Sequence, residues 1–273
     1  MTVDVEDYFH VSAFENLIAK SEWENQECRV ERNIERILAL YDQHKIKATF
    51  FILGWIAERY PSLVRAIVDH GHEIACHSYW HRRAFNQTLE AFTEEIITTK
   101  KLLEDLSGEA VTGYRAPSYS IGEKNLWAHE ALERAGYRYS SSIYPISHDH
   151  YGMPDAPRFA YRPVADSPFL EIPITTSYLF NKKLPAGGGG YFRFFPYFIS
   201  KALLKRVNKK EAQSAIFYFH PWEIDPGQPR QAPISAKTRF RHYLNLNRTE
   251  DRLKRLCQDF NWDRMDRLFL SAE

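Results

Sequence analysis

Two histidines stand four residues apart in the segment CHSYWHR, which runs from Cys76 to Arg82. On a helix or a helical turn, this spacing places the rings of His77 and His81 on one face, where two imidazole nitrogens could bind one divalent metal ion. The chain contains 11 histidines, so a chance pair at this spacing is not unusual. The pair becomes informative only if other reactive groups lie near it in the fold.

Other polar side chains of this kind follow segments that have the pattern of short buried strands. The first such segment, Met1 to Val5, runs into an acidic turn, and later segments end in further polar residues. These residues are Asp4, Glu6 and Asp7 after the first segment, His77 and His81 after "HEIAC", Arg115, Pro117 and Tyr119 after "VTGY", and His220 after "AIFYF".

Strand and helix patterns alternate along the chain through about residue 145. Buried strands are predicted at 47–54, closed by Gly54, and at 72–78, and helices at 33–44, 61–70, 88–107 and 123–135. This alternation is typical of parallel βα units. Because the strand ends of parallel α/β barrels converge on one mouth, we expect the polar residues to share one rim.

The residue types on this rim suit metal-assisted hydrolysis. Two imidazoles and one carboxylate are a common ligand set for a catalytic divalent metal, with a position left open for water. A second carboxylate beside that water is a candidate general base, and a separate histidine is a candidate general acid.

Composition excludes several other classes of protein. The chain has 273 residues and a net charge of +1, from 36 basic and 35 acidic residues, so no basic field predicts binding to nucleic acid. No apolar run is long enough for a membrane span, and the first ten residues lack the features of a signal peptide. With three widely spaced cysteines, these features predict a cytoplasmic protein, acting in solution or at the inner membrane face.

Four segments together resemble a known family. "TVDVED", "HSYWH", "RAPSY" and "FYFHPWE" occur in the order of the successive motifs of polysaccharide deacetylases, the NodB-homology enzymes of carbohydrate esterase family four. The whole chain looks most like the subgroup found with exopolysaccharide loci and exosortase systems. The resemblance implies an α/β fold, a distorted (β/α) barrel of the NodB-homology type over residues 1–228, with a C-terminal helical extension, 229–273, packed on the same domain.

The resemblance also implies roles for individual residues. His77 and His81 match the imidazole ligands of Zn²⁺, or of another divalent metal such as Co²⁺. Asp4 matches the base, Arg115 the arginine that orients the base, and His220 the acid that protonates the leaving amine. Pro117 matches the residue that shapes a loop, in which a backbone N–H near Ser118 or Tyr119 holds the oxyanion.

The sequence departs from the family pattern at three places. The usual Asp-Asp pair is spread over "DVED", so the carboxylate ligand is either Glu6 or Asp7. Strand alternation favours Glu6, which points the same way as Asp4, whereas the family's use of aspartate favours Asp7. Ser118 stands where many members have tyrosine, and Ser140 stands where an aspartate usually tunes the catalytic histidine.

Two further features have open interpretations. Trp80 and Trp222 adjoin candidate site histidines and either line a sugar groove or form a hydrophobic wall. The four glycines in "PAGGGGYFRFF" form either a mobile loop over the site or a plain linker.

The sequence therefore predicts a metal-dependent hydrolase that removes N-acetyl groups from an amino-sugar polysaccharide or its lipid-linked oligosaccharide precursor, in exopolysaccharide biosynthesis. A ring-opening hydrolase of cyclic amides is a second possibility, which the retained pair of His77 and His81 disfavours. A carbohydrate-binding pseudoenzyme is a third, and Ser140 is the residue that supports it.

Overall fold

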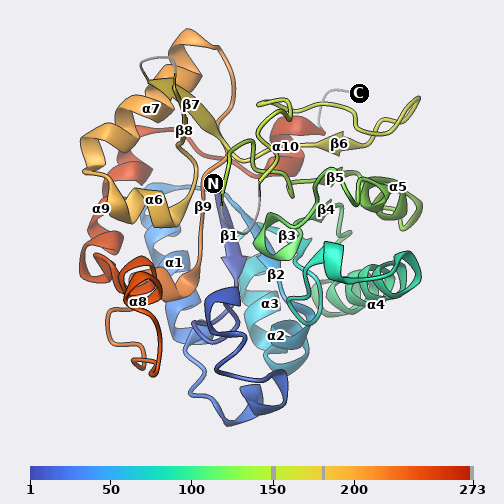
Figure 1. Ribbon diagram of the computed structural model, residues 1–273, viewed down its shortest axis with the longest axis horizontal. Helices are drawn as coiled ribbons and strands as arrows, with labels where there is room; N and C mark the ends of the chain where they lie inside the picture. Colours follow the sequence, from blue (N-terminus) through green and yellow to red (C-terminus); the bar gives the residue numbers. More distant parts are fainter. Residues whose placement is uncertain (149–151, 180–181, 271–273) are drawn as a thin grey trace.

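A curled sheet of parallel strands forms the centre of the computed structural model, which describes residues 1–148, 152–179 and 182–270 (Figure 1). Within these residues the sheet has seven strands in the order β6-β5-β4-β3-β2-β1-β9. The strands are β1 (Thr2–Val5), β2 (Thr49–Ile52), β3 (Glu73–Cys76), β4 (Gly113–Tyr114), β5 (Tyr139–Ser140), β6 (Leu170–Glu171) and β9 (Tyr218–Phe219). All neighbouring strands are parallel, so the predicted distorted (β/α) barrel is confirmed.

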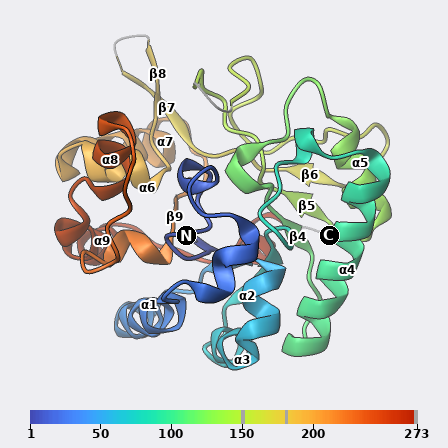
Figure 2. The same ribbon diagram turned by 60° about the horizontal axis from the view of Figure 1, so that its bottom comes forward.

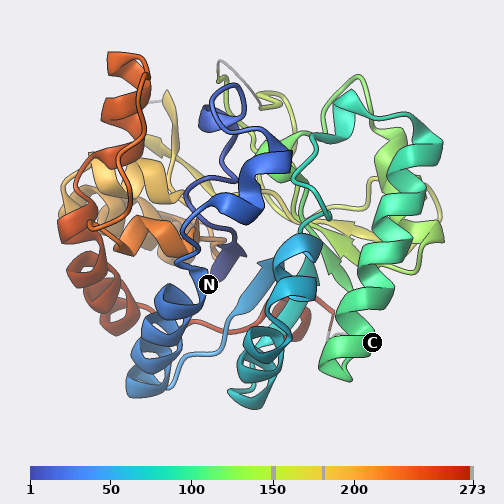
Figure 3. The same ribbon diagram turned by 90° about the horizontal axis from the view of Figure 1, so that it is seen from below.

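Amphipathic helices cover the outer surface of this sheet (Figure 3). They are α1 (Val30–His44), α2 (Gly54–Arg59), α3 (Pro61–Asp69), α4 (Leu89–Ser107) and α5 (Trp127–Arg134). In α1 the buried residues Ile34, Ile37, Leu38 and Tyr41 share one face, as their spacing predicted. The bounds of α4 follow from its caps, because the Thr88 hydroxyl accepts the N–H of Ala91 and Gly108 takes a left-handed conformation.

The sequence predicted that Gly54 closes a strand, and this prediction is wrong. Strand β2 ends at Ile52, and Gly54 begins α2. Its backbone N–H donates to the carbonyl of Ser78 at 2.9 Å. A Cβ atom here would lie 2.4 Å from Cδ2 of Tyr79, so glycine is needed for the close approach of the loop that follows β3.

The run of glycines at 187–190 is neither a mobile loop nor a linker. Gly187 to Gly189 are buried, and Gly188 pairs with Tyr218 in a parallel bridge beside β9. A Cβ atom on Gly187 would lie 2.1 Å from the carbonyl oxygen of Ile216. Glycine is therefore present for close packing, and the run leads directly into α6 (Gly189–Phe194).

The C-terminal part of the chain packs on the side of the sheet next to β9 (Figure 2). It contains α7 (Tyr197–Lys210), α8 (Ala236–Tyr243) and α9 (Leu246–Asp259), and an antiparallel hairpin of β7 (Thr176–Leu179) and β8 (Lys182–Pro185) precedes them. The last helix, α10 (Met265–Phe269), lies instead at the start of β2, where the N–H of Met265 donates to the Thr49 hydroxyl at 2.8 Å. Helix α9 packs against α1 and against the 3-10 turn Pro221–Ile224. The division of the chain at residue 228 stays a prediction. Among the helices described, none is long and apolar enough to cross a bilayer.

Leu256 tests the contribution of α9 to the fold, because its side chain is fully buried. We expect Leu256→Ala to lower the free energy of unfolding by about 2–5 kcal/mol, through lost apolar burial and the cavity left behind. Urea denaturation followed by circular dichroism measures this loss. Leu126→Ala, at a site that is 43% exposed, is the control and should change stability by less than about 0.5 kcal/mol. Equal losses in the two variants would contradict the packing of α9 described here.

Candidate active site

The carboxyl ends of β1, β3, β4 and β9 bring the predicted polar residues together at one rim. Since β3, β2, β1 and β9 are consecutive neighbours in a parallel sheet, the residues that follow them emerge on the same side. The structure joins Asp4, Glu6, His77, His81, Arg115 and His220 in one cluster, in which His81 and His220 are partly exposed and the other four are buried.

Glu6, His77 and His81 form a set that could hold a metal ion. Each offers one ligand atom, and these atoms all lie within 4.8 Å of one another. Oε2 of Glu6 is buried and accepts no hydrogen bond from the residues that the structure describes, although it lies 3.2 Å from Nε2 of His81. A buried carboxylate oxygen without a donor fits a cation in this position.

The hydrogen bond made by His77 leaves its other ring nitrogen ready to bind a metal. Nδ1 of His77 lies 2.8 Å from the carbonyl oxygen of Arg115. Because a carbonyl can only accept, Nδ1 carries the proton and Nε2 keeps its lone pair. Burial also lowers the pKa of His77, and it lowers the pKa of His81 to about 4, so both rings are neutral at physiological pH. Two neutral imidazoles and a carboxylate fit zinc.

Asp7 turns away from the histidines. Its Oδ1 accepts the backbone N–H of Tyr8 at 2.8 Å, and its Oδ2 accepts the N–H groups of Arg29 and Val30, the latter at 2.8 Å. The carboxylate therefore braces the start of α1. Of the two candidates for the third ligand, Glu6 is the one that the structure places beside the histidines, although its binding of a metal stays a prediction.

Arg115 is fully buried and holds Asp4 in place. Nη1 donates to Oδ1 of Asp4 at 2.5 Å and to the hydroxyl of Thr2 at 2.9 Å. Nε and Nη2 donate to the carbonyl and the hydroxyl of Ser141, at 3.1 and 3.0 Å. A charge-assisted bond of this kind fixes the orientation of the carboxylate. Oδ2 of Asp4 then faces Nε2 of His220, 4.0 Å away.

His220 lies between two carboxylates. Its Nε2 is 2.9 Å from Oε1 of Glu6, and its Nδ1 is 2.8 Å from Oε1 of Glu223. Burial alone lowers the pKa of His220, but the two carboxylates outweigh it and raise the pKa to about 10. The ring is therefore protonated at neutral pH, as a general acid requires.

The loop after β4 offers a backbone donor near Asp4. Pro117 opens a short 3-10 turn in which Ser118 and Tyr119 both have positive φ, at 53° and 51°. The N–H of Tyr119 donates to the carbonyl of Ala116 at 3.0 Å and closes the turn. Within the described residues, the N–H of Ser118 has no such bond, so it is the better oxyanion donor of the two predicted. The Tyr119 hydroxyl reaches Oδ2 of Asp4 at 3.4 Å.

Ser140 does not lie on His220 in the way that the family pattern suggested. Its hydroxyl donates to that of Ser142 at 2.7 Å, and the carboxylate that contacts Nδ1 of His220 is Glu223 instead. The sequence analysis missed Glu223, although its place three residues after His220, in a turn with proline at its start, was a possible signal.

The two tryptophans have different environments. Trp222 is only 5% exposed, and its ring stacks on His220 at 5.2 Å and on His242 at 4.2 Å. Of the two interpretations given above, a sugar groove or a hydrophobic wall, the wall fits Trp222. Trp80 is half-buried against Tyr79 and Trp23.

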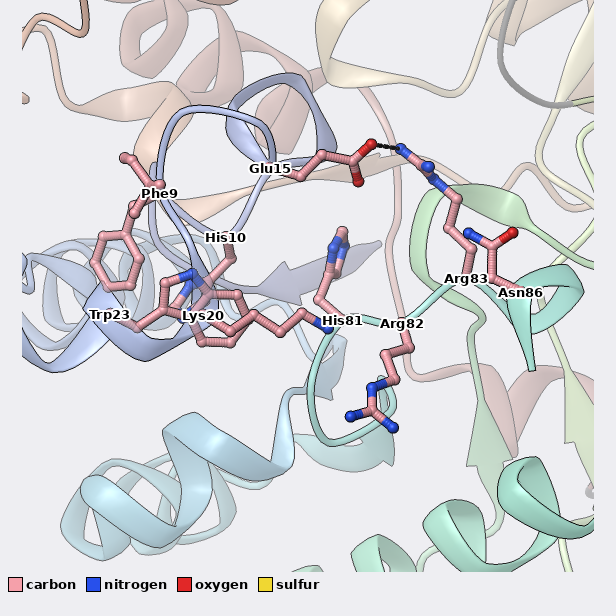
Figure 4. Close-up of a pocket in the computed structure, with 10 residues that line it drawn as sticks. Phe9, His10, Glu15, Lys20, Trp23, His81, Arg82, Arg83 and Asn86 are labelled. Atoms are coloured by element: carbon pink, nitrogen blue, oxygen red, sulfur yellow. Dashed lines mark hydrogen bonds and ion pairs between the residues drawn. The ribbon is translucent and has the colours of Figure 1, made fainter. Parts of the chain in front are cut away.

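A cavity of about 170 Å³ opens beside His81 (Figure 4). Figure 4 shows His10 and Trp23 on one side of it and His81 and Arg82 on the other, with the Lys20 side chain extending from Trp23 toward His81. His10 and Trp23 come from the segment between β1 and α1, which the motif analysis did not assign to the site.

Comparison with known families divides the chain into two parts. Residues 24–140 match the polysaccharide deacetylase family. Over these residues the chain matches a polysaccharide deacetylase domain. Residues 141–270 match a second family, described as a domain of unknown function (DUF3473). His77, His81 and Arg115 lie in the first part, whereas His220 and Glu223 lie in the second.

Curated relatives of the deacetylase domain carry related names. The chain is 31% identical over 113 residues to a peptidoglycan deacetylase of Helicobacter pylori, and 38% identical over 96 residues to a peptidoglycan-N-acetylglucosamine deacetylase of Bacillus cereus. These alignments cover 41% and 35% of this chain, and only 38% and 35% of the two relatives.

Solved structures show the same fold at low identity. A putative polysaccharide deacetylase from Mycobacterium smegmatis superposes with a TM-score of 0.63 at 18% identity, over 100% of this chain and 88% of that one. A structure titled Puue Allantoinase gives a TM-score of 0.58 at 18% identity, over 87% and 71%.

The choice between Glu6 and Asp7 is testable by metal analysis. We expect His77→Ala and Glu6→Gln to lose bound zinc, because each removes a ligand. Asp7→Asn should keep far more zinc and instead lower stability, since three backbone N–H groups lose a charged acceptor. Elemental analysis of the purified variants measures the stoichiometry. Greater zinc loss in Asp7→Asn than in Glu6→Gln would contradict this arrangement.

Buried neutral histidines predict acid sensitivity of the metal-free protein. Burial lowers the pKa of His81 to about 4 and that of His10 to about 3, whereas both titrate near 6.5 when unfolded. The unfolded chain then binds more protons than the folded one, so stability is present above about pH 6.5 and falls as the pH drops towards 4. Urea midpoints at pH 7 and pH 5 should show a clear decrease, and equal midpoints would refute this assignment.

Proposed function

We propose that the protein removes N-acetyl groups from an amino-sugar polysaccharide or its lipid-linked precursor, with a divalent metal ion held by Glu6, His77 and His81. The observation that carries this proposal is the joint presence of three elements on one rim. A metal-ready triad lies beside an arginine-bound carboxylate, Asp4, and beside a protonated histidine, His220. The curated names of the relatives support an N-acetylated amino sugar as the substrate.

The residues of the rim divide the hydrolysis between them. A zinc or cobalt ion bound to the triad would polarise the amide carbonyl and lower the pKa of water toward about 7. Asp4, held by Arg115, takes a proton from the attacking water as the new C–O bond forms. The N–H of Ser118 donates to the oxyanion. His220 gives its proton to the amide nitrogen, the C–N bond breaks, and acetate and a free amine leave.

Two alternative functions have less support. The likeness to the allantoinase structure shows the fold alone, and the relatives found by sequence carry deacetylase names. A pseudoenzyme was suggested by Ser140, which lacks the carboxylate expected beside the catalytic histidine. Because Glu223 supplies a carboxylate to His220, that reason for an inactive protein no longer holds. A place in exopolysaccharide biosynthesis, in the cytoplasm or at the inner membrane face, belongs to this proposal.

Asp4→Asn is the direct test of the proposed base. The variant should keep its zinc, because Asp4 is not in the triad, yet release acetate from an acetylated glucosamine oligomer about a hundredfold or more slowly. Asp105→Asn, on the exposed side of α4, is the control and should match the unmodified protein. Near-normal acetate release by Asp4→Asn would remove Asp4 from the mechanism.

A further inference from the structure

We propose that residues 141–270 complete the active site by fixing the His220 ring, and that Glu223, clamped by Arg193 in space left by Gly189, is the positioning residue. This inference rests on the proposed deacetylase function for its kinetic consequences. It assigns a role to the part of the chain that matches the domain of unknown function.

Glu223 holds both the ring and the backbone of His220 with one oxygen. Oε1 lies 2.8 Å from Nδ1 of His220 and accepts the backbone N–H of the same residue at 3.1 Å. Since an ionised carboxylate only accepts, Nδ1 must carry a proton. The ring is therefore oriented with Nε2 toward the rim, 2.9 Å from Glu6 and 4.0 Å from Asp4. A carboxylate that orients an imidazole in this way also selects its tautomer.

Arg193 prevents the Glu223 carboxylate from rotating. Nε of Arg193 donates to Oε2 of Glu223 at 2.6 Å, and both side chains are almost fully buried. The remaining guanidinium nitrogens donate to backbone carbonyls at the C-terminal end of α8, at His242 (2.9 Å), Leu244 (2.9 Å) and Arg241 (3.1 Å). The guanidinium also lies over the Trp222 ring, 5.4 Å from its centroid. Three hydrogen bonds to backbone carbonyls thus fix Arg193, in addition to its bond to Glu223.

The glycine run provides the space for this carboxylate. A Cβ atom on Gly189 would lie 2.2 Å from Oε1 and 2.6 Å from Oε2 of Glu223. A Cβ atom on Gly190, one residue later in the same helix, would meet nothing within 4 Å. Gly189 is therefore required by space rather than by backbone conformation, and the neighbouring glycine offers a matched control.

The arrangement explains how the chain can dispense with an aspartate at position 140. The Ser140 hydroxyl bonds Ser142, and the carboxylate for His220 arrives from the turn directly after β9. The acid, its positioning carboxylate and the arginine clamp all come from residues 141–270. Neither residues 24–140 nor residues 141–270 therefore contain the whole site.

Gly189→Ala and Gly190→Ala provide the kinetic test, because neither changes a residue that bonds His220. With zinc-loaded protein and an acetylated glucosamine oligomer, Gly189→Ala should lower kcat at least about tenfold while KM changes less than about twofold. Gly190→Ala should leave both constants within about twofold. Glu223→Asp should keep more of kcat than Glu223→Gln, because it retains the charge that Arg193 and His220 require. Full kcat in both Gly189→Ala and Glu223→Gln would overturn the proposal.

An NMR measurement of the His220 ring separates this inference from the proposed function. We expect the NMR signal of a slowly exchanging Nδ1 proton in the unmodified protein and in Gly190→Ala. Loss of the signal in His220→Gln assigns it to the His220 ring. In Gly189→Ala the signal should be lost or shifted. If Gly189→Ala does not fold, Glu223→Gln gives the same comparison with an isosteric side chain. Absence of the Nδ1 proton in the unmodified protein overturns the clamp even if acetate is released. The predicted proton in a protein that releases no acetate refutes the deacetylase function and supports the clamp.

Discussion

The buried guanidinium of Arg115 is the constraint on which the rest of the site depends. A cation removed from water costs several kcal/mol unless every donor is paired. Each guanidinium nitrogen of Arg115 donates at least one hydrogen bond, to Asp4, Thr2 or Ser141, and its Cζ atom lies 4.0 Å from the centroid of the Phe51 ring. Its carbonyl, at the same time, fixes the ring of His77. One residue thus joins β1, β2, β4 and β5 and orients both the candidate base and a candidate ligand.

A second buried arginine, Arg193, holds a carboxylate on the other side of the rim. Arg193 bonds Glu223, and Glu223 bonds His220, so the candidate acid is held by hydrogen bonds as the candidate base is. Burial by itself raises the pKa of Glu223, but Arg193 and His220 outweigh it and lower that pKa to about 2. Each arginine pairs with a buried carboxylate, Asp4 or Glu223, in surroundings where an unpaired charge would be unfavourable. The site is built where these two arginine-centred networks meet.

Much of this arrangement could be predicted from the sequence, because it depends on periodicity. Parallel neighbouring strands end at the same edge of the sheet, so the polar residues after each strand were expected to lie close together. The alternation of side chains along β1 favoured Glu6 over Asp7 as the residue that faces the histidines. The end of α4 followed from Gly108, whereas α1 begins at Val30 rather than at residue 33 and α5 begins at Trp127 rather than at residue 123.

The features that were missed depend on contacts between distant segments. In the sequence, Gly54 predicted the end of a strand and the run that begins at Gly187 predicted backbone freedom, but in the fold these two glycines permit close approach to Tyr79 and to the carbonyl of Ile216. Glycine has the same sequence signature in both cases, so the sequence does not distinguish them. Similarly, Ser140 suggested that the site lacks a carboxylate beside the histidine. In the fold Glu223 supplies a carboxylate to His220 from the turn after β9, and Arg193 holds it there.

The central claim is that one metal ion in the Glu6, His77 and His81 triad makes this rim a deacetylase. The most direct measurement is a titration of the metal-free protein with zinc, with acetate release from an acetylated glucosamine oligomer followed at each step. The account predicts that the rate rises linearly and reaches a plateau at one equivalent of zinc. Full acetate release by the metal-free protein, or stoichiometric zinc binding without any acetate release, would contradict it.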